Sequence, residues 1–125
     1  MPTLTGMIKE FHENFALDYN GPPRELPMDL AIKRIEFINE EFKEYMDAWH
    51  AHDLEKQLDS LVDLVYVVLG TAHLHGFNFD EAFKRVHEAN MKKERDYDLD
   101  SMKSGVYKPE GWEPPFLTDL VRNND

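Results

Sequence analysis

The chain has 125 residues, no cysteine, and 25 acidic against 14 basic residues, which gives a formal net charge of −11. Such an acidic surface argues against a nucleic-acid duplex or an anionic membrane as a partner, because both bind basic surfaces. The lack of cysteine excludes a disulfide framework and thiolate chemistry.

The length suits a single domain, residues 1–125, whose surface is large for its volume. We therefore expect a homo-oligomer, either a dimer or a tetramer. The amino terminus lacks the basic-then-apolar pattern of a signal peptide, and no apolar run is long enough to span a membrane. The expected location is the cytoplasm.

The first half of the chain predicts two amphipathic helices. Residues 3–17 form a short helix that docks on the main bundle and ends at the turn 18–23. A second helix runs from near Met28 to about Trp49, with apolar residues at regular helical spacing on its core face. These residues are Ala31, Ile35, Ile38, Phe42, Tyr45, Met46 and Trp49.

A short turn at 49–53 leads into the central helix, which must therefore lie antiparallel beside the second helix. Asp53 fits the N-cap of this helix, and Gly76, just after His75, fits its C-cap. A fourth helix begins after Asn78, in a capping box with Glu81. It buries Phe79, Ala82, Phe83, Val86 and Ala89.

The helical period is lost after about residue 96, so the tail at about 97–125 is expected to be irregular. One turn of helix is expected at 118–121, and apolar anchors hold the tail in place: Tyr107, Trp112, Phe116 and Leu117. The predicted fold is all-α, an antiparallel bundle of about four helices with its core at about 28–93, completed by oligomerisation.

The central helix carries an acid where burial is expected. Residues 61–69 are apolar except for Asp63, so this helix must be buried inside the subunit or between subunits. A lone buried carboxylate is costly unless it is paired or binds a cation. Asp59 projects roughly 40° away from Asp63, on nearly the same side of the helix. A lysine, an arginine or hydrogen bonds could satisfy Asp63 equally well.

The acids of the second helix fall into two groups when they are placed at 3.6 residues per turn. Glu41 and Glu44 border the core, whereas three others face water: Glu36, Glu40 and Asp47. Glu41 and Glu44, together with Asp59 and Asp63 of the central helix, make four carboxylates that converge from two antiparallel helices. Such oxygen ligands suit Mg²⁺, with Mn²⁺ as a substitute, and an acidic protein that handles a polyphosphate needs such ions.

Five runs of the sequence, in order, carry a family resemblance: EFH at 10–12, INEEFKE at 38–44, DSLVDLVYV at 59–67, VHEANMKK at 86–93 and KPEGW at 108–112. Together they resemble the MazG-like all-α nucleoside triphosphate pyrophosphatases, which belong with phosphoribosyl-ATP pyrophosphatase and the dimeric dUTPases. The resemblance implies hydrolysis of a (deoxy)nucleoside triphosphate to the monophosphate and pyrophosphate, by a metal-activated water that attacks the α-phosphorus.

The same resemblance makes Glu41, Glu44 and Asp63 the catalytic metal ligands and implies that the subunits pair. In the family the second half of the motif is Glu-x-x-Asp. Here Ser60 stands three residues before Asp63, and Asp59 is the acid available as a fourth ligand.

The predicted substrate-binding residues lie in three parts of the chain. By resemblance, Asn90 and Lys93 contact the substrate, and His12 lies within the EFH run. Arg34 and Lys92 are candidates for the outer phosphates, and both read equally well as surface charges. Substrates left open are dUTP or dCTP, phosphoribosyl-ATP and an alarmone. A non-catalytic helical regulatory dimer is the alternative from another class.

Overall fold

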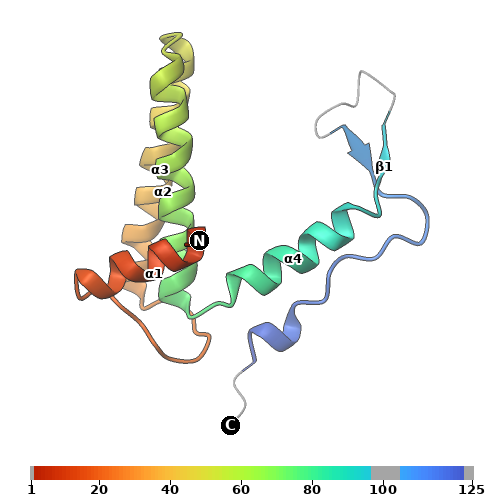
Figure 1. Ribbon diagram of the computed structural model, residues 1–125, viewed down its shortest axis with the longest axis horizontal. Helices are drawn as coiled ribbons and strands as arrows, with labels where there is room; N and C mark the ends of the chain where they lie inside the picture. Colours follow the sequence, from red (N-terminus) through yellow and green to blue (C-terminus); the bar gives the residue numbers. More distant parts are fainter. Residues whose placement is uncertain (1, 97–104, 123–125) are drawn as a thin grey trace. The chain divides into compact units, whose positions relative to one another are not determined.

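The computed structural model describes residues 2–96 and 105–122 and is mostly helical, which confirms the predicted fold class (Figure 1). Part of the predicted tail, residues 97–104 and 123–125, lies outside the described residues. The helices are α1 (Leu4–Asn14), α2 (Met28–His50), α3 (Leu54–His75) and α4 (Phe79–Asn90). A two-stranded sheet, β1 (Glu94–Arg95) with β2 (Val106–Tyr107), and a 3-10 turn at Thr118–Leu120 follow.

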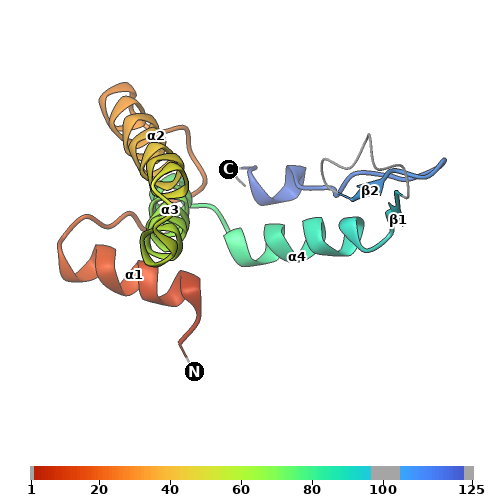
Figure 2. The ribbon, with the colours of Figure 1, turned by 90° about the horizontal axis from the view of Figure 1, so that it is seen from above.

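Helices α2 and α3 lie side by side as an antiparallel pair (Figures 1 and 2), as the short turn between them predicts. The side chain of Asp53 caps α3 by accepting a hydrogen bond from the backbone N–H of Lys56 at 3.1 Å. Gly76 ends α3 with a φ of +76°, a conformation that glycine adopts without strain. Both predicted caps are confirmed.

Helix α1 packs across α3, as predicted, and buries Ile8 there (Figure 1). It ends at Asn14, earlier than the predicted residue 17. The cause is local: Ala16 takes a positive φ of 57°, and the backbone N–H of Leu17 turns back to the carbonyl of His12. The apolar period continues past Asn14, but the backbone leaves the helix.

The predicted core face of α2 is only partly covered by this chain, which corrects the sequence analysis. Four of its predicted core residues are exposed: Ile35, Phe42, Met46 and Trp49. Helix α3 also exposes apolar side chains: Leu61, Val62, Val65, Tyr66 and Val68. Because α3 packs mainly against α2 and α1, part of its apolar circumference stays open within one chain. No single helix of the described residues is long and apolar enough to cross a membrane.

Residues Asp80–Arg122 form a second compact unit, separate from the unit built by α1, α2 and α3. Within it, the segment after β2 returns along α4. The indole Nε1 of Trp112 donates a hydrogen bond to the carbonyl of Ala89 at 2.8 Å. Arg85 donates two hydrogen bonds to the carboxylate of Asp119, at 2.7 and 3.1 Å. Trp112 is therefore one of the four tail anchors that the sequence predicted, whereas two others, Tyr107 and Phe116, are exposed.

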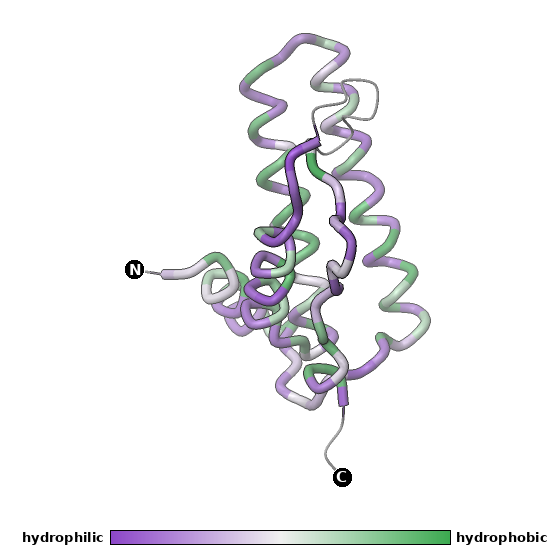
Figure 3. The backbone as a smooth tube through the Cα atoms, turned by 90° about the vertical axis from the view of Figure 1, so that its right-hand side faces the viewer, coloured by the Kyte–Doolittle hydropathy of each residue, from purple (hydrophilic) through white to green (hydrophobic). Residues whose placement is uncertain are grey.

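Two details of this second unit differ from the prediction. Ala89 is buried, but Phe83 and Val86 on the same helix are exposed, because the return segment covers only one side of α4. The sheet was not expected, since strands of two residues carry no readable hydrophobic period. The predicted turn of helix near residue 118 is confirmed as a 3-10 turn. Figure 3 shows hydrophobic and hydrophilic segments alternating along the helices.

Candidate metal centre

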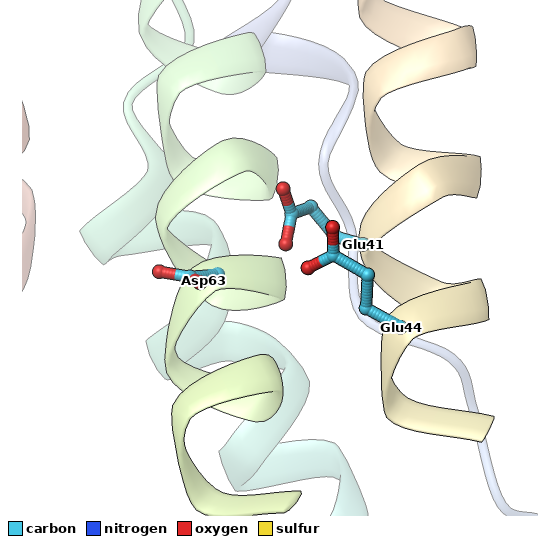
Figure 4. Close-up of side chains that lie close together, drawn as sticks. All are labelled: Glu41, Glu44 and Asp63. Atoms are coloured by element: carbon cyan, nitrogen blue, oxygen red, sulfur yellow. The ribbon is translucent and has the colours of Figure 1, made fainter. Parts of the chain in front are cut away.

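Three carboxylates come together near the middle of the α2–α3 pair. Glu41 and Glu44, one turn apart, project from α2 toward α3, which carries Asp63 (Figure 4). The antiparallel pairing sets them opposite, because they lie at similar distances from the turn that joins the helices. Each residue offers a carboxylate oxygen within 4.8 Å of the other two. Within residues 2–96 and 105–122, no other group of histidines, aspartates and glutamates meets this criterion.

Glu41 holds the most constrained carboxylate of the three. Its Oε2 is buried and has no hydrogen-bond partner among the described residues. Burial raises the pKa of Glu41, and the charge of Glu44, a hydrogen bond with Glu44 and the charge of Asp63 raise it further. A buried charged oxygen without a partner costs several kcal/mol, on the order of the penalties measured for such groups. This oxygen is satisfied if a cation binds to it.

Asp63 supplies the third carboxylate, from α3, and its surroundings also disfavour the ionised form. Burial raises the pKa of Asp63 first, and the negative charges of Asp59 and Glu44 raise it further. Each neighbouring carboxylate makes ionisation of the next one harder. A divalent cation among them reverses that effect, because it favours the ionised form of every ligand.

The predicted angular separation of the acids on α2 is confirmed for Glu41 but not for Glu44, which was expected to border the core and is exposed. The carboxylate of Glu41 turns inward, while the three acids assigned to the solvent side are exposed: Glu36, Glu40 and Asp47. Glu44 lies at the rim and is itself exposed. The period of the helix was therefore enough to separate the inward acid from its neighbours.

Asp59 lies outside the group of three and is exposed, although its charge reaches Asp63. Ser60, at the position where the family has an acid, is buried at 5 % exposure. The chain therefore brings together three of the four predicted ligands, and the role of Asp59 stays a prediction.

The donor set fits a hard divalent cation. All three ligands supply oxygen, which is the donor that Mg²⁺ prefers. Opposite oxygens in an octahedral Mg²⁺ site lie about 4.2 Å apart, twice the usual metal–oxygen distance. Neighbouring oxygens on such an ion lie about 3.0 Å apart. The three carboxylate oxygens lie within 4.8 Å of one another, so one ion would have to draw them closer together.

Comparison with known families gives a match that includes this centre. The sequence profile of phosphoribosyl-ATP pyrophosphohydrolase matches residues 8–90, about two thirds of the chain. The chain belongs to this family. The protein is thus a nucleotide pyrophosphohydrolase, a hydrolase of a family that typically uses divalent metal. No individual curated protein matches the chain. The narrower assignment to the MazG-like branch stays a prediction.

The match leaves out Lys93 and the KPEGW run of the tail, both of which entered the sequence resemblance. The acidic centre lies fully within it. The match to the phosphoribosyl-ATP pyrophosphohydrolase family therefore covers the two helices that carry the carboxylates and does not cover the tail.

Arg34, a predicted phosphate-binding residue, joins α2 to α3. Its Nε donates to the hydroxyl of Thr71 at 3.0 Å, and its Nη2 donates to the carbonyl of Val67 at 2.9 Å. Gly70 makes this approach possible, since a Cβ at that position would lie 2.8 Å from Nη2. Burial lowers the pKa of Arg34. The observed contacts are structural, and a contact with substrate stays a prediction.

His12, another predicted substrate-binding residue, is almost fully buried against the same part of α3. Its Nδ1–H donates to the carbonyl of Leu17 at 2.9 Å, and its ring lies 5.0 Å from that of His73. The Nε2 of His73 lies 2.7 Å from a carboxylate oxygen of Asp18. Burial is the main cause that lowers the pKa of His12.

The sequence analysis missed this polar cluster of Asp18, His12 and His73. Asp18 and His73 lie too far apart in sequence for any local pattern to connect them. One signal was available: Gly70 interrupts an apolar helix, where glycine is costly unless something packs closely against the backbone. His12 and Arg34 are what packs there.

The remaining predicted substrate-binding residues belong to the unit Asp80–Arg122. Asn90 is exposed at the last position of α4. Lys92 lines a cavity of about 470 Å³ together with Arg85, Phe116 and others of the return segment. The Nζ of Lys93 lies 5.2 Å from the centre of the Trp112 ring.

Proposed function

We propose that the protein is a Mg²⁺-dependent pyrophosphohydrolase that cleaves a nucleoside triphosphate, or a nucleotide built like one, between the α- and β-phosphates. Water is added across that phosphoanhydride bond, which yields the monophosphate and pyrophosphate. The observation that carries the proposal is the buried Oε2 of Glu41 beside Glu44 and Asp63, which has no hydrogen-bond partner in the part of the chain that the structure describes.

The chain's own residues would act mainly by position and charge. Glu41, Glu44 and Asp63 would hold the metal, with Asp59 as a further ligand. The metal, when bound, neutralises phosphate oxygens and makes a coordinated water more acidic. The two long helices keep the three carboxylates in place, so little reorganisation is needed when substrate arrives. Asn90 and Lys93, with Arg34, Lys92 and His12, are the proposed substrate contacts.

The substrate is proposed as a (deoxy)nucleoside triphosphate, and phosphoribosyl-ATP is the second candidate because the matching family profile carries that name. Both contain a triphosphate whose α–β bond is cleaved with release of pyrophosphate. The remaining candidates, dUTP or dCTP as preferred triphosphates and an alarmone, would need the same acidic centre.

Pyrophosphate release over a nucleotide panel, measured with Mg²⁺ and with chelator, tests this proposal. The panel contains the ribo- and deoxyribonucleoside triphosphates, phosphoribosyl-ATP and an alarmone. We expect turnover of at least one nucleotide with Mg²⁺ and none in chelator. A folded protein that hydrolyses none of them would favour the non-catalytic regulatory dimer.

We also propose that the protein is a homo-oligomer in which a second copy covers the exposed apolar sides of the helices. One apolar groove of about 490 Å³ lies between α1 and α3 and is lined by Leu4, Met7, Val62, Val65 and others. Another, of about 590 Å³, lies between α2 and α3 and includes Ile35, Phe42 and Val68. Exposed apolar side chains gathered in grooves such as these are typical of protein–protein contact sites.

Light scattering on the purified protein tests the oligomer. Val65→Lys places a charge in the first groove and should shift the wild-type oligomer toward monomer. Leu54→Lys is the matched control, because Leu54 is a highly exposed leucine at the start of the same helix. A wild type that is monomeric at micromolar concentration would overturn the proposal.

A further inference from the structure

The small sheet of the second unit sets two lysines opposite each other. Glu94 pairs with Tyr107 across the antiparallel strands, so Lys93 and Lys108 occupy the next position along the register. The hydroxyl of Tyr107 donates to Glu94 Oε2 at 2.5 Å, which places these two side chains on one face. Because side chains alternate along a strand, Lys93 and Lys108 belong to the other face. Like charges in directly opposed positions destabilise a sheet.

Trp112 brings both lysines to one ring. The Nζ of Lys93 lies 5.2 Å and the Nζ of Lys108 lies 5.1 Å from the ring centre of Trp112. Both distances are in the range of cation–π attraction. The two ammonium groups are consequently no more than about 10 Å apart. With a charge-assisted hydrogen bond of about 2.8 Å at each end, oxygens of one phosphate chain can reach both.

The indole itself is fixed. Its Nε1 donates to the carbonyl of Ala89 on α4, and its backbone N–H donates to the carbonyl of Pro109 at 3.0 Å. Gly111, with a φ of +82°, makes the turn that returns Trp112 toward α4. The KPEGW run therefore builds a rigid platform and not a loose tail.

Neither lysine forms an ion pair with a carboxylate of the described residues. Several acids of this unit are bonded elsewhere: Glu94 to Tyr107, and Glu81 and Asp119 to Arg85. In a chain with a net charge of −11, it is unusual that two lysines lie at one ring and that neither pairs with an acid of residues 2–96 and 105–122. An anionic ligand would supply the opposite charge.

We propose that Lys93, Lys108 and Trp112 form a clamp for the phosphate groups of a polyphosphate ligand. Lys108 and Trp112 are new assignments, while Lys93 was already a predicted substrate contact. A role of the clamp in catalysis rests on the proposed function, because that function requires a polyphosphate substrate. The clamp's ability to bind pyrophosphate does not depend on turnover.

Fluorescence of Trp112 tests the clamp directly. The chain has two tryptophans, so Trp49→Phe leaves Trp112 as the one reporter. Inorganic pyrophosphate is titrated in chelator at constant ionic strength, which removes any contribution from a metal in the acidic centre. We expect a saturable change in emission, and sulfate at equal ionic strength should not reproduce it.

Variants in the same background decide whether the lysines are responsible. Lys108→Gln should weaken pyrophosphate binding about tenfold, whereas Lys108→Arg should retain it, because arginine keeps the charge and the ring contact. Lys84→Gln is the matched control, since Lys84 is an exposed lysine on α4. Equal affinity in Lys108→Gln and Lys84→Gln would overturn the clamp, and so would a wild-type response that never saturates.

A kinetic measurement separates the clamp from the proposed function. Lys108→Gln should raise KM for the nucleotide about tenfold and change kcat less, as expected for a residue that positions phosphate. If the wild type hydrolyses no nucleotide, the proposed function fails while the fluorescence titration still decides the clamp. If hydrolysis occurs with an unchanged KM in Lys108→Gln, the clamp has no role in the reaction and its catalytic part is overturned.

Discussion

The acidic centre on α2 and α3 gathers negative charges, whereas the lysine clamp beside β2 gathers positive charges. Three carboxylates meet in the first, and one of their oxygens is buried without a partner. Two ammonium groups meet in the second, where an indole face partly compensates them and Lys108 is exposed. Burial is the difference that matters, because water reaches the lysines and screens the exposed charge of Lys108, whereas it leaves the buried oxygen of Glu41 uncompensated.

This comparison predicts the order of effects on function. Removing a buried ligand should damage the protein's activity far more than removing an exposed charge of equal size. The predictions below start with Asp63 and end with Asp59, which lies four residues earlier on the same helix and is exposed.

Asp63→Asn should abolish pyrophosphate release while the helical content stays as in the wild type. The amide keeps the shape of the side chain but removes the charge that a cation needs. Steady-state pyrophosphate release and circular dichroism measure the two properties. Undiminished Mg²⁺-dependent turnover in the folded variant would show that the reaction does not use this centre.

Glu41→Gln and Glu44→Gln should each lower turnover by orders of magnitude. Glu40→Gln and Asp47→Asn are matched controls from the same helix, and they should cost little because these exposed acids lie outside the group of three carboxylates. Comparing kcat/KM across the four variants gives the answer. A Glu40 variant as inactive as the Glu41 variant would mean that the inward side of α2 has been misassigned.

Metal should stabilise the folded protein through the same carboxylates. Binding to the folded state alone contributes roughly 2.7 kcal/mol at a hundredfold excess of metal over Kd, which corresponds to a rise of several degrees in Tm. Thermal melts in millimolar Mg²⁺ or Mn²⁺ and in chelator measure the shift. Asp63→Asn should remove most of it, and an equal shift in that variant would place the cation elsewhere on the surface.

When a chelator has removed divalent metal, the carboxylates of this centre should make the stability of the folded protein depend on pH. The pKa values of Glu41 and Asp63 are raised in the folded state, so the folded protein binds more protons than the unfolded chain. Their contribution to stability is therefore present at low pH and is lost as pH rises through the raised values. The difference in Tm between wild type and Asp63→Asn should favour the variant increasingly toward neutral pH. A constant difference would contradict the raised pKa of Asp63.

Much of the fold was predictable because local signals agreed with one another. The hydrophobic period, Asp53 as N-cap and Gly76 as C-cap predicted α2 and α3 nearly to the residue. What failed was the assignment of burial. A helical period shows which side chains share a face, but it cannot show whether the same chain covers that face, and Ile35 and Phe42 are exposed here.

The candidate site also has a part that the sequence predicted and a part that it did not. Glu41, Glu44 and Asp63 were predictable because helix geometry and one antiparallel pairing bring them together. The Asp18–His73 contact and the Trp112 platform were not, since they depend on loops that return to a helix from a distance. The KPEGW run could be read in the sequence. Only the structure shows that Trp112 is hydrogen-bonded to Ala89 and that two lysine ammonium groups lie near its ring.

Asp59→Asn tests whether an exposed acid next to the centre binds the metal directly or acts only through its charge. Asp59 lies outside the group of three and is exposed, yet its charge raises the pKa of Asp63. If it acts only through this field, the variant should weaken Mg²⁺ binding about tenfold or less and keep most of the turnover, because solvent screens an exposed charge. If it is a direct ligand in place of the family's acid, the loss should approach that of Asp63→Asn. Calorimetric titration with Mg²⁺ distinguishes the two, and Ser60→Ala serves as a control beside it that removes no charge.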